Sequence, residues 1–368
     1  MRIALTILLS TLFIRTMAVE PKYPVSAIPE DMKQGMYAVV RESESRFYID
    51  SKSQSSHYVR KVITILNSKA DDFADIAILY DKLRKVESFK ANVYDAQGNL
   101  IKKLKQSDIK DQSAISGYSL FEDDRIKYAD LSQTTYPYTV EYEYTLSMRY
   151  LYSIPDFYLY NDDEVTTQKE FFAIIYPKEL KPRYRLFKIE APKIVTEPDK
   201  RESMTWTFEN TKPKKFERLS LGSDLAVPNI KVGPSLFEYD GYAGDMSSWV
   251  EYGKWIAQLN NGRDALPDVT KKKIRDITKD LKTTEEKTRA LYAYLQGKTR
   301  YVSIQLGIGG LQPFDATTVD QTGYGDCKAL SNYMVAMLKE AGVKGYYATI
   351  MAGDNAPDVT VDFPGHQG

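Results

Sequence analysis

Residues 322–343 read TGYGDCKALSNYMVAMLKEAGV and contain Cys327, the single cysteine among 368 residues. Gly342 stands near the end of this stretch, where a helix commonly closes with a left-handed residue. Apolar side chains recur before it at the three- and four-residue spacing of one helix face: Leu330, Met334, Met337, Leu338 and Ala341. The pattern therefore predicts an amphipathic helix that begins at Cys327 and ends before Gly342.

The position of Cys327 has two interpretations. At a helix N-terminus the backbone N–H groups are unpaired and the helix dipole is positive, which favours a thiolate over a thiol. Gly323 and Gly325 allow a tight turn before the helix that leaves the sulfur accessible, so Cys327 could be a nucleophile for acyl chemistry. Alternatively, Cys327 is a small apolar side chain packed under the first turn, since buried cysteines are usually inert.

The sequence around this helix predicts an α+β domain over residues 234–368. Three helical patterns come first, at residues 246–259, 267–281 and 283–296, and the third opens with Thr283 and Glu286 in the spacing of a capping box. A strand is expected at RYVSIQL (300–306), then a glycine-rich loop at 307–313, and a second strand at GYYATIM (345–351) after the cysteine helix.

Residues 19–233 predict a β-rich domain. In YTVEYEYTLSMRY (138–150), apolar and aromatic residues alternate with Glu141 and Glu143, which is typical of a strand with one buried and one solvated face. Many short strands with few helical patterns favour an antiparallel β-sandwich. The other main candidates are residues 36–49, 55–66, 88–104 (a hairpin), 169–177, 184–191 and 203–210.

Composition and the N-terminus limit the classes of function. The formal net charge is +0, from 50 basic and 50 acidic residues, so nothing favours capture of nucleic acid. Residues 1–18, MRIALTILLSTLFIRTMA, have the layout of a secretory signal that would be cleaved near Ala18, and the apolar run is too short for a membrane anchor. We therefore expect an exported, periplasmic or secreted chain that is soluble after cleavage and has no internal disulfide.

The motif YGDCKALSNYMVAMLKEAGVKGYYATI, with the preceding EEKTRALYAYLQGKTRYVSI, resembles the core of the transglutaminase-like superfamily, which has papain-type cysteine chemistry. The β-rich stretch is similar in layout to the domain of unknown function often found ahead of such cores in exported bacterial proteins. The resemblance implies that Cys327 attacks an amide carbonyl to give a thioester, that a histidine protonates the leaving amine, and that an aspartate orients the histidine. The acyl group would then pass to water or to an amine.

The remaining site residues are less well matched to this resemblance. The chain has two histidines: His57, which we expect to be a surface or sheet residue, and His366, a possible base in a loop-like FPGHQG context. Gln321 is a possible oxyanion donor. The aspartates at positions 354, 358 and 362 precede His366 and are expected to be turn residues. The simplest expectation is that the α+β domain is incomplete and that two further strands, with two triad members, follow Gly368.

Two hypotheses follow from the sequence. The first is an exported transglutaminase-like cysteine enzyme, or a fragment of one, that cleaves peptide or protein amides, with hydrolysis favoured over transamidation. The second is a non-catalytic binding or assembly protein of the cell envelope, in which the β domain holds a protein or glycan partner. We expect no cofactor and no metal, because two scattered histidines do not supply ligands to join Cys327.

Overall fold

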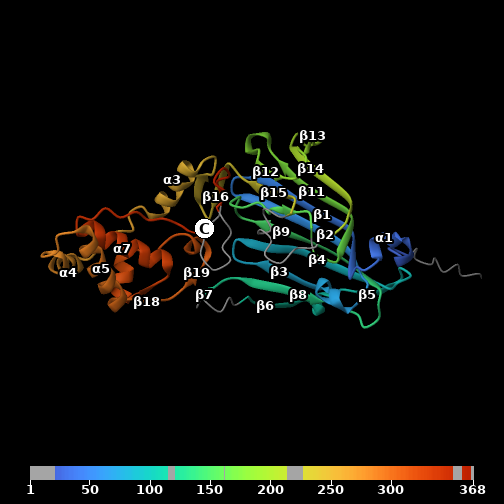
Figure 1. The fold of residues 1–368 in the computed structure, drawn as a ribbon, viewed down its shortest axis with the longest axis horizontal. Helices are drawn as coiled ribbons and strands as arrows, with labels where there is room; N and C mark the ends of the chain where they lie inside the picture. Colours follow the sequence, from blue (N-terminus) through green and yellow to red (C-terminus); the bar gives the residue numbers. More distant parts are fainter. Residues whose placement is uncertain (1–20, 115–120, 161, 214–226, 351–358, 366–368) are drawn as a thin grey trace, which may run out of the picture.

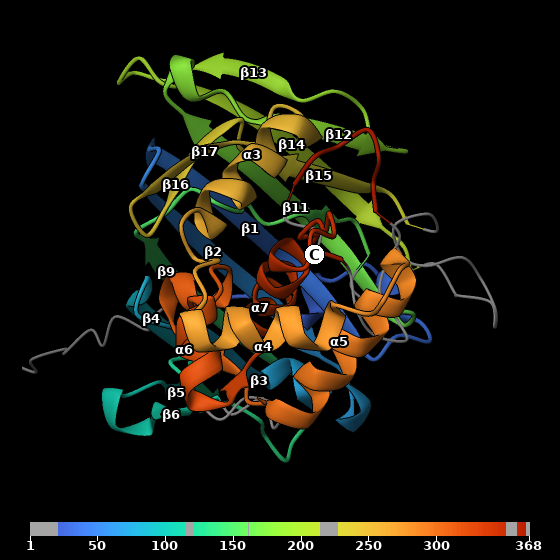
Figure 2. The ribbon, with the colours of Figure 1, turned by 90° about the vertical axis from the view of Figure 1, so that its left-hand side faces the viewer.

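The computed structural model describes residues 21–114, 121–160, 162–213, 227–350 and 359–365, so the predicted signal segment, residues 1–18, lies outside the described residues. Figure 1 shows a broad β region at one end of the long axis and a helical region at the other. Figure 2 looks onto the helical end, with the large sheet behind it. The predicted fold class, a β-rich region followed by an α+β region, is confirmed.

An eight-stranded sheet dominates the β region. Its strand order is β13-β14-β11-β1-β2-β9-β4-β5. The bounds are β1 (Ala38–Ser51), β2 (Gln54–Ile65), β4 (Arg84–Tyr94), β5 (Leu100–Lys103), β9 (Tyr138–Met148), β11 (Val165–Tyr176), β13 (Lys193–Thr196) and β14 (Glu202–Thr211).

The sheet is mixed, whereas the sequence predicted antiparallel pairing throughout. Strand β1 runs parallel to β11, with Phe47 opposite Ile174, and antiparallel to β2. Parallel neighbours need a long crossover connection, and the many residues between β1 and β11 provide one. The other pairs in this sheet are antiparallel.

The predicted alternation in β9 is confirmed. Val140 and Leu146 are buried in the core of the β region, and Tyr142 and Tyr144 pack against it. On the opposite face Glu141 accepts a hydrogen bond from Arg60 (2.9 Å). One face of the sheet therefore forms a core and the other is polar, as the period of two in the sequence requires.

Smaller elements flank the large sheet. Two three-stranded sheets have the orders β10-β15-β12 and β3-β8-β6, and β16 pairs with β17. The strands are β3 (Asp75–Tyr80), β6 (Lys110–Ser113), β8 (Arg125–Asp130), β10 (Phe157–Tyr158), β12 (Arg183–Phe187), β15 (Asn229–Gly233), β16 (Leu236–Tyr239) and β17 (Tyr242–Asp245). Among the residues described here, this region contains the helix α1 (Glu30–Lys33) and the 3-10 helices η1 (Val25–Ala27), η2 (Ser68–Ala74), η3 (Gln106–Asp108) and η4 (Lys178–Leu180).

Two hydrophobic cores contain most of the buried apolar side chains, and a smaller cluster joins Val25, Ile28 and Met32 to Val39. The first belongs to the β region and also includes Tyr252, Trp255 and Leu259 of α3 (Trp249–Asn260). The second starts at Leu266 and lies among the later helices. Helix α3 thus packs with the β core, although the sequence grouped residues 246–259 with the α+β domain.

The helical region consists of α4 (Asp268–Thr278), α5 (Thr284–Lys298), α6 (Ala316–Thr322) and α7 (Cys327–Glu340). The capping box predicted at Thr283 and Glu286 is present at the start of α5. The predicted strand at 300–306 is reduced to β18 (Arg300–Tyr301) and β19 (Ile304–Gln305), followed by the 3-10 helix η5 (Gly307–Gly310). Strand β18 pairs with β20 (Tyr324–Gly325), and β19 pairs with β7 (Phe121–Glu122).

The prediction of a strand at 345–351 is wrong for residues 345–350, the part of it that the structure describes, because they have no regular secondary structure. A strand needs a neighbour to accept and donate its backbone hydrogen bonds, and no strand of the described residues pairs with this segment. Among the helices described, none is both long and apolar enough to cross a membrane.

Candidate active site

Cys327 is the first residue of α7 and is exposed to solvent. Asp326 caps the helix: its carboxylate accepts a hydrogen bond from the backbone N–H of Ala329 (3.0 Å), which satisfies one of the orphan donors of the first turn. The alternative in which Cys327 packs under the first turn does not hold, because the side chain is not buried. The thiol is therefore available to a molecule in solution.

Two glycines shape the turn in front of Cys327. Gly323 has φ 70° and closes α6 in the left-handed conformation, which glycine adopts without strain. A Cβ on Gly325 would lie 2.9 Å from the Cβ of Ala329, closer than two carbons approach. The backbone N–H of Arg300 and that of Val302 donate to Gly323 (2.9 Å) and Gly325 (3.0 Å), so β18 holds the turn against the helix.

Two tyrosines flank the thiol. Burial raises the pKa of Tyr301, and the neighbouring charges of Cys327 and Asp326 act in the same direction. Burial also raises the pKa of Tyr347 to about 12, and the charges of Cys327 and Asp326 contribute in the same direction. Neither residue stood out in the sequence, because they are two of 28 tyrosines.

A cluster of polar side chains packs around the first turn of α7. Lys328 Nζ lies 2.5 Å from Asp326 Oδ2 in a largely buried ion pair. Lys328 also reaches Gln305 Oε1 at 3.5 Å, and Gln305 Nε2 donates to Ser303 Oγ (3.2 Å). These contacts link β19 to the helix start, so the orientation of the cap is fixed by side chains from two elements.

Of the other residues named from the sequence, those that the structure describes make no hydrogen bond or ion pair with Cys327. His57 lies on β2 within 2.8 Å of Ser45 Oγ, and burial lowers its pKa to about 4, so its ring is neutral near pH 7. Gln321 is exposed on α6. Asp362 is exposed and pairs with Arg185 (3.2 Å). His366 and the aspartates at 354 and 358 lie outside the described residues.

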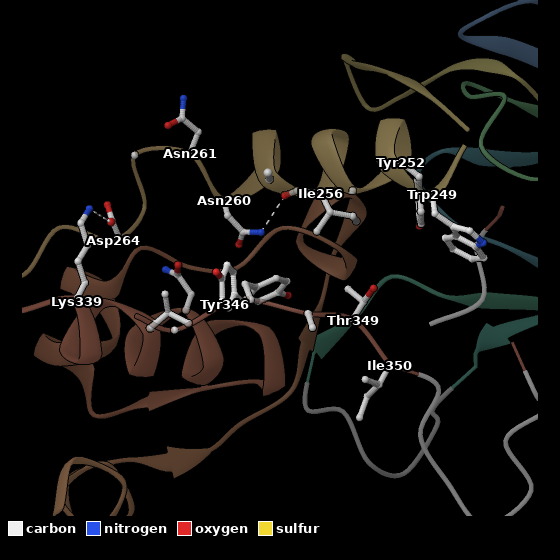
Figure 3. A pocket seen from close by; sticks show the side chains of 18 of the residues that line it. Trp249, Tyr252, Ile256, Asn260, Asn261, Asp264, Lys339, Tyr346, Thr349 and Ile350 are labelled. Carbon is white, nitrogen blue, oxygen red and sulfur yellow. Dashed lines mark hydrogen bonds and ion pairs between the residues drawn. The ribbon is translucent and has the colours of Figure 1, made fainter. Parts of the chain in front are cut away.

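No group of three or more histidine, cysteine, aspartate or glutamate side chains suited to a metal ion occurs in the described part of the chain. A groove of about 740 Å³ does lie beside the site, between α3, α7 and residues 345–350, and Tyr347 is part of its wall. Figure 3 shows this groove. The arrangement thus combines an exposed thiol, a neighbouring hydroxyl and a space for a ligand.

Two family models match separate parts of the chain, one in the β region and one in the helical region. Residues 51–215 match a domain of unknown function, DUF3857, and residues 271–360 match the transglutaminase-like superfamily. A DUF3857 domain precedes a transglutaminase-like core. The resemblance inferred from the Gly-Asp-Cys-Lys motif is thereby confirmed at the level of the family, while the roles of individual residues stay predictions.

One solved structure supports the fold. A protein described as "a putative protease" from Parabacteroides distasonis ATCC 8503 is similar with a TM-score of 0.61 and 14% identity, over 84% of this chain and 59% of that one. The chain therefore spans 59% of that protein's length. Aminopeptidase A of Legionella pneumophila is 16% identical over 66% of this chain and 28% of its own, and its TM-score of 0.27 is too low to indicate a shared fold. No curated protein shows significant similarity.

Proposed function

We propose that this protein is a transglutaminase-like cysteine hydrolase that cleaves peptide or protein amide bonds through a thioester on Cys327. One observation carries the proposal: the single thiol is exposed at the first residue of α7, directly after the turn formed by Gly323 and Gly325. Hydrolysis is favoured over transamidation because water is the acceptor present at the highest concentration.

The reaction has two steps. In the first, the Cys327 thiolate adds to the amide carbonyl carbon, and the backbone N–H of Cys327, a first-turn donor, stabilises the oxyanion. The C–N bond then breaks, the amine leaves with a proton, and a thioester remains. In the second step water adds to the thioester and releases the carboxylic acid, which restores the thiol.

The proton for the leaving amine requires an acid–base group. His57 is unsuited to this role, since it is a neutral residue of the β core hydrogen-bonded to Ser45. His366 is the other histidine of the sequence and is our candidate. Gln321 remains a second, weaker candidate for the oxyanion donor.

We also propose that the protein acts outside the cytoplasm. Residues 1–18 support export through their basic start, apolar run and small-residue cleavage site. N-terminal sequencing of the protein from the periplasmic or extracellular fraction should give a chain beginning at Val19.

The rate of alkylation by iodoacetamide, measured from pH 5 to 9, tests the nucleophile. We expect the thiol of the folded protein to be alkylated at least as fast as that of the urea-unfolded protein, because its side chain is exposed to solvent. The single cysteine makes the labelled residue unambiguous. Cys327→Ala should lower amide hydrolysis by about 10³-fold or more while leaving the far-UV circular dichroism unchanged.

A thiol that stays unreactive until the protein is unfolded would contradict the enzyme hypothesis. The same result would favour the alternative, a non-catalytic cell-envelope binding or assembly protein.

A further inference from the structure

The face of the large sheet that forms the β core carries polar side chains at its centre. Glu170 on β11 and Phe172, a core residue, lie two positions apart and so share this face. Lys61 on β2 shares it with Ile63 for the same reason. Strand pairing places Ser43 of β1 directly between them, opposite Glu170 on one side and Lys61 on the other. A polar row therefore crosses three strands that lie side by side in Figure 1.

Two further residues extend this row along the strands. Ser45 follows Ser43 on the same face of β1, and its Oγ lies 2.8 Å from Nε2 of His57 on β2. We call the set of Ser43, Ser45, His57, Lys61 and Glu170 the polar strip. All of them except Glu170 are partly exposed, so solvent reaches the strip although apolar residues surround it.

Glu170 is the least accessible member of the strip, at 5% exposed. Of the acidic residues that the structure describes, only Glu170 and Asp326 are buried, and Asp326 is occupied as the cap of α7. Within the described part of the chain, Glu170 Oε2 has no hydrogen-bond partner. An unpartnered buried carboxylate oxygen destabilises a folded protein, so its presence calls for a functional explanation. The oxygen is positioned to accept a hydrogen bond from a bound molecule.

Glu170 and Lys61 lie close enough for each to affect the ionisation of the other. Burial raises the pKa of Glu170 to about 7, and the positive charge of Lys61 acts in the opposite direction. Burial lowers the pKa of Lys61, and the charge of Glu170 opposes that change. Because a carboxylate and an ammonium compensate each other, a ligand with a net charge would be repelled by one of them. The strip therefore favours an uncharged ligand.

Aromatic side chains stand at both ends of the row. Tyr142 on β9 is directly opposite Lys61, and Tyr144 follows it on the same face. The two tyrosine rings are partly exposed, their planes differ by 1°, and their centroids are 6.4 Å apart. Phe208 on β14 lies opposite Glu170. Aromatic rings beside hydrogen-bonding groups match the two kinds of surface on a sugar, its apolar C–H faces and its hydroxyls, which both donate and accept.

We propose that the polar strip, together with Tyr142 and Tyr144, is a binding site for an uncharged saccharide. A sugar hydroxyl donates to Glu170 Oε2, and the C–H face of a sugar ring packs against the tyrosine rings. Of the two kinds of partner expected for the β domain, protein and glycan, the site selects the glycan. The inference concerns the β region and is independent of the chemistry proposed for Cys327.

Glu170→Gln is the direct test. It keeps the size and shape of the side chain but replaces one acceptor oxygen with an NH₂ donor. Glu209 on the neighbouring strand β14 is exposed, and it lies opposite Lys169, on the other face of the sheet. Glu209→Gln is therefore the matched control, with the same chemical change outside the site.

The measurement is isothermal titration calorimetry of the purified protein with maltotriose, cellotriose and chitotriose, which are uncharged. We expect at least one of them to bind, Glu170→Gln to weaken that binding by about tenfold or more, and Glu209→Gln to leave it unchanged. Trigalacturonate, which is anionic, should bind about tenfold more weakly than the best uncharged sugar. Binding of none of the uncharged sugars, equal affinities of the two glutamine variants, or equally tight binding of trigalacturonate would each overturn the inference.

Tyr142→Leu provides a second test should Glu170→Gln fail to fold. Leucine keeps an apolar side chain against the core but removes the ring, so affinity for the sugar should fall by about fivefold or more. Tyr142→Phe keeps the ring and should bind like the unchanged protein. Equal affinities of these two variants, with far-UV circular dichroism showing both to be folded, would reject the site.

Discussion

Replacing Gly325 with alanine tests how closely the turn before Cys327 is packed. Gly325→Ala would place a Cβ 2.9 Å from Ala329 Cβ and 3.4 Å from Val319 Cγ2. Because these atoms belong to the first turn of α7 and to α6, the turn must shift. We expect the free energy of unfolding to fall by about 2 kcal/mol and the alkylation rate of Cys327 to change, both measured on the purified variant.

The control for Gly325→Ala is Gly297→Ala. A Cβ at Gly297 meets nothing within 4 Å, and alanine is a better helix former, so this change should stabilise the protein by about 0.5–1 kcal/mol. If Gly325→Ala were equally stabilising, the close packing of the turn would be refuted.

At the level of single residues, the sequence predicted Cys327 but not its neighbours. The helix periodicity and the Gly-x-Gly turn are local, so they identify the first residue of α7 without knowledge of the fold. Tyr301 and Tyr347 come to Cys327 only through the pairing of β18 with β20 and the path of the chain after α7. Such contacts depend on tertiary structure and leave no periodic signal.

At the level of elements, Asp320 joins the helices of the second core. From α6 it accepts hydrogen bonds from Thr270 on α4 (2.8 Å) and Tyr333 on α7 (2.7 Å), and it pairs closely with Lys298 on α5. Burial acts to raise the pKa of Asp320, but the hydrogen bonds from these three side chains outweigh it, so the net shift is downward. The carboxylate therefore stabilises the arrangement of four helices.

Asp320→Asn should lower the free energy of unfolding by about 3 kcal/mol at pH 7, because it leaves Lys298 beside a neutral partner and the Asp320 side chain is only 10% exposed. A depressed pKa contributes stability above the unfolded value of about 3.9 and loses it as pH falls through the folded pKa. The difference between the two proteins in urea unfolding should thus be constant from pH 6 to 8 and shrink below about pH 4. A difference that grows on acidification would contradict this assignment.

Helices with a regular spacing of apolar residues were predicted well. A strand that needs a pairing partner was not. Helices α4, α5 and α7 lie where the apolar spacing indicated, and the capping box forms at Thr283. The stretch GYYATIM has a strand-like composition, but its described residues have no pairing strand and stay irregular. Strand propensity reflects how well a residue fits a sheet, so it cannot predict a strand by itself.

On the scale of the whole molecule, helix α3 connects the two cores by packing as well as by the continuity of the chain. Helix α3 packs into the β core and also forms one wall of the groove that α7 lines on the other side. The shape of this groove therefore depends on both regions. The sequence alone does not show that α3 packs with the β core, because its aromatic face could pack against either core.

The segment 359–365 packs against the β region and α3. Arg183 on β12 stacks on the ring of Phe363 (4.9 Å from its centroid) and donates to the carbonyl of Pro364 (2.7 Å). Trp249 Nε1 on α3 donates to the carbonyl of Val361 (2.7 Å). Residues far apart in the sequence thus hold this segment against the β region, next to the groove.

Arg183→Ala should loosen this segment without unfolding the protein. Loss of the stacking and of a charge-assisted hydrogen bond removes about 1–3 kcal/mol of local stability, so the Phe363 amide, which donates to Thr360 (2.9 Å), should exchange about ten- to a hundredfold faster. Arg185→Ala, which removes only the exposed pair with Asp362, should change that rate by less than about fivefold. Equal exchange rates in the two variants would mean that the Arg183 contacts do not hold the segment, and the groove wall would then have to be stabilised by α3 and α7 alone.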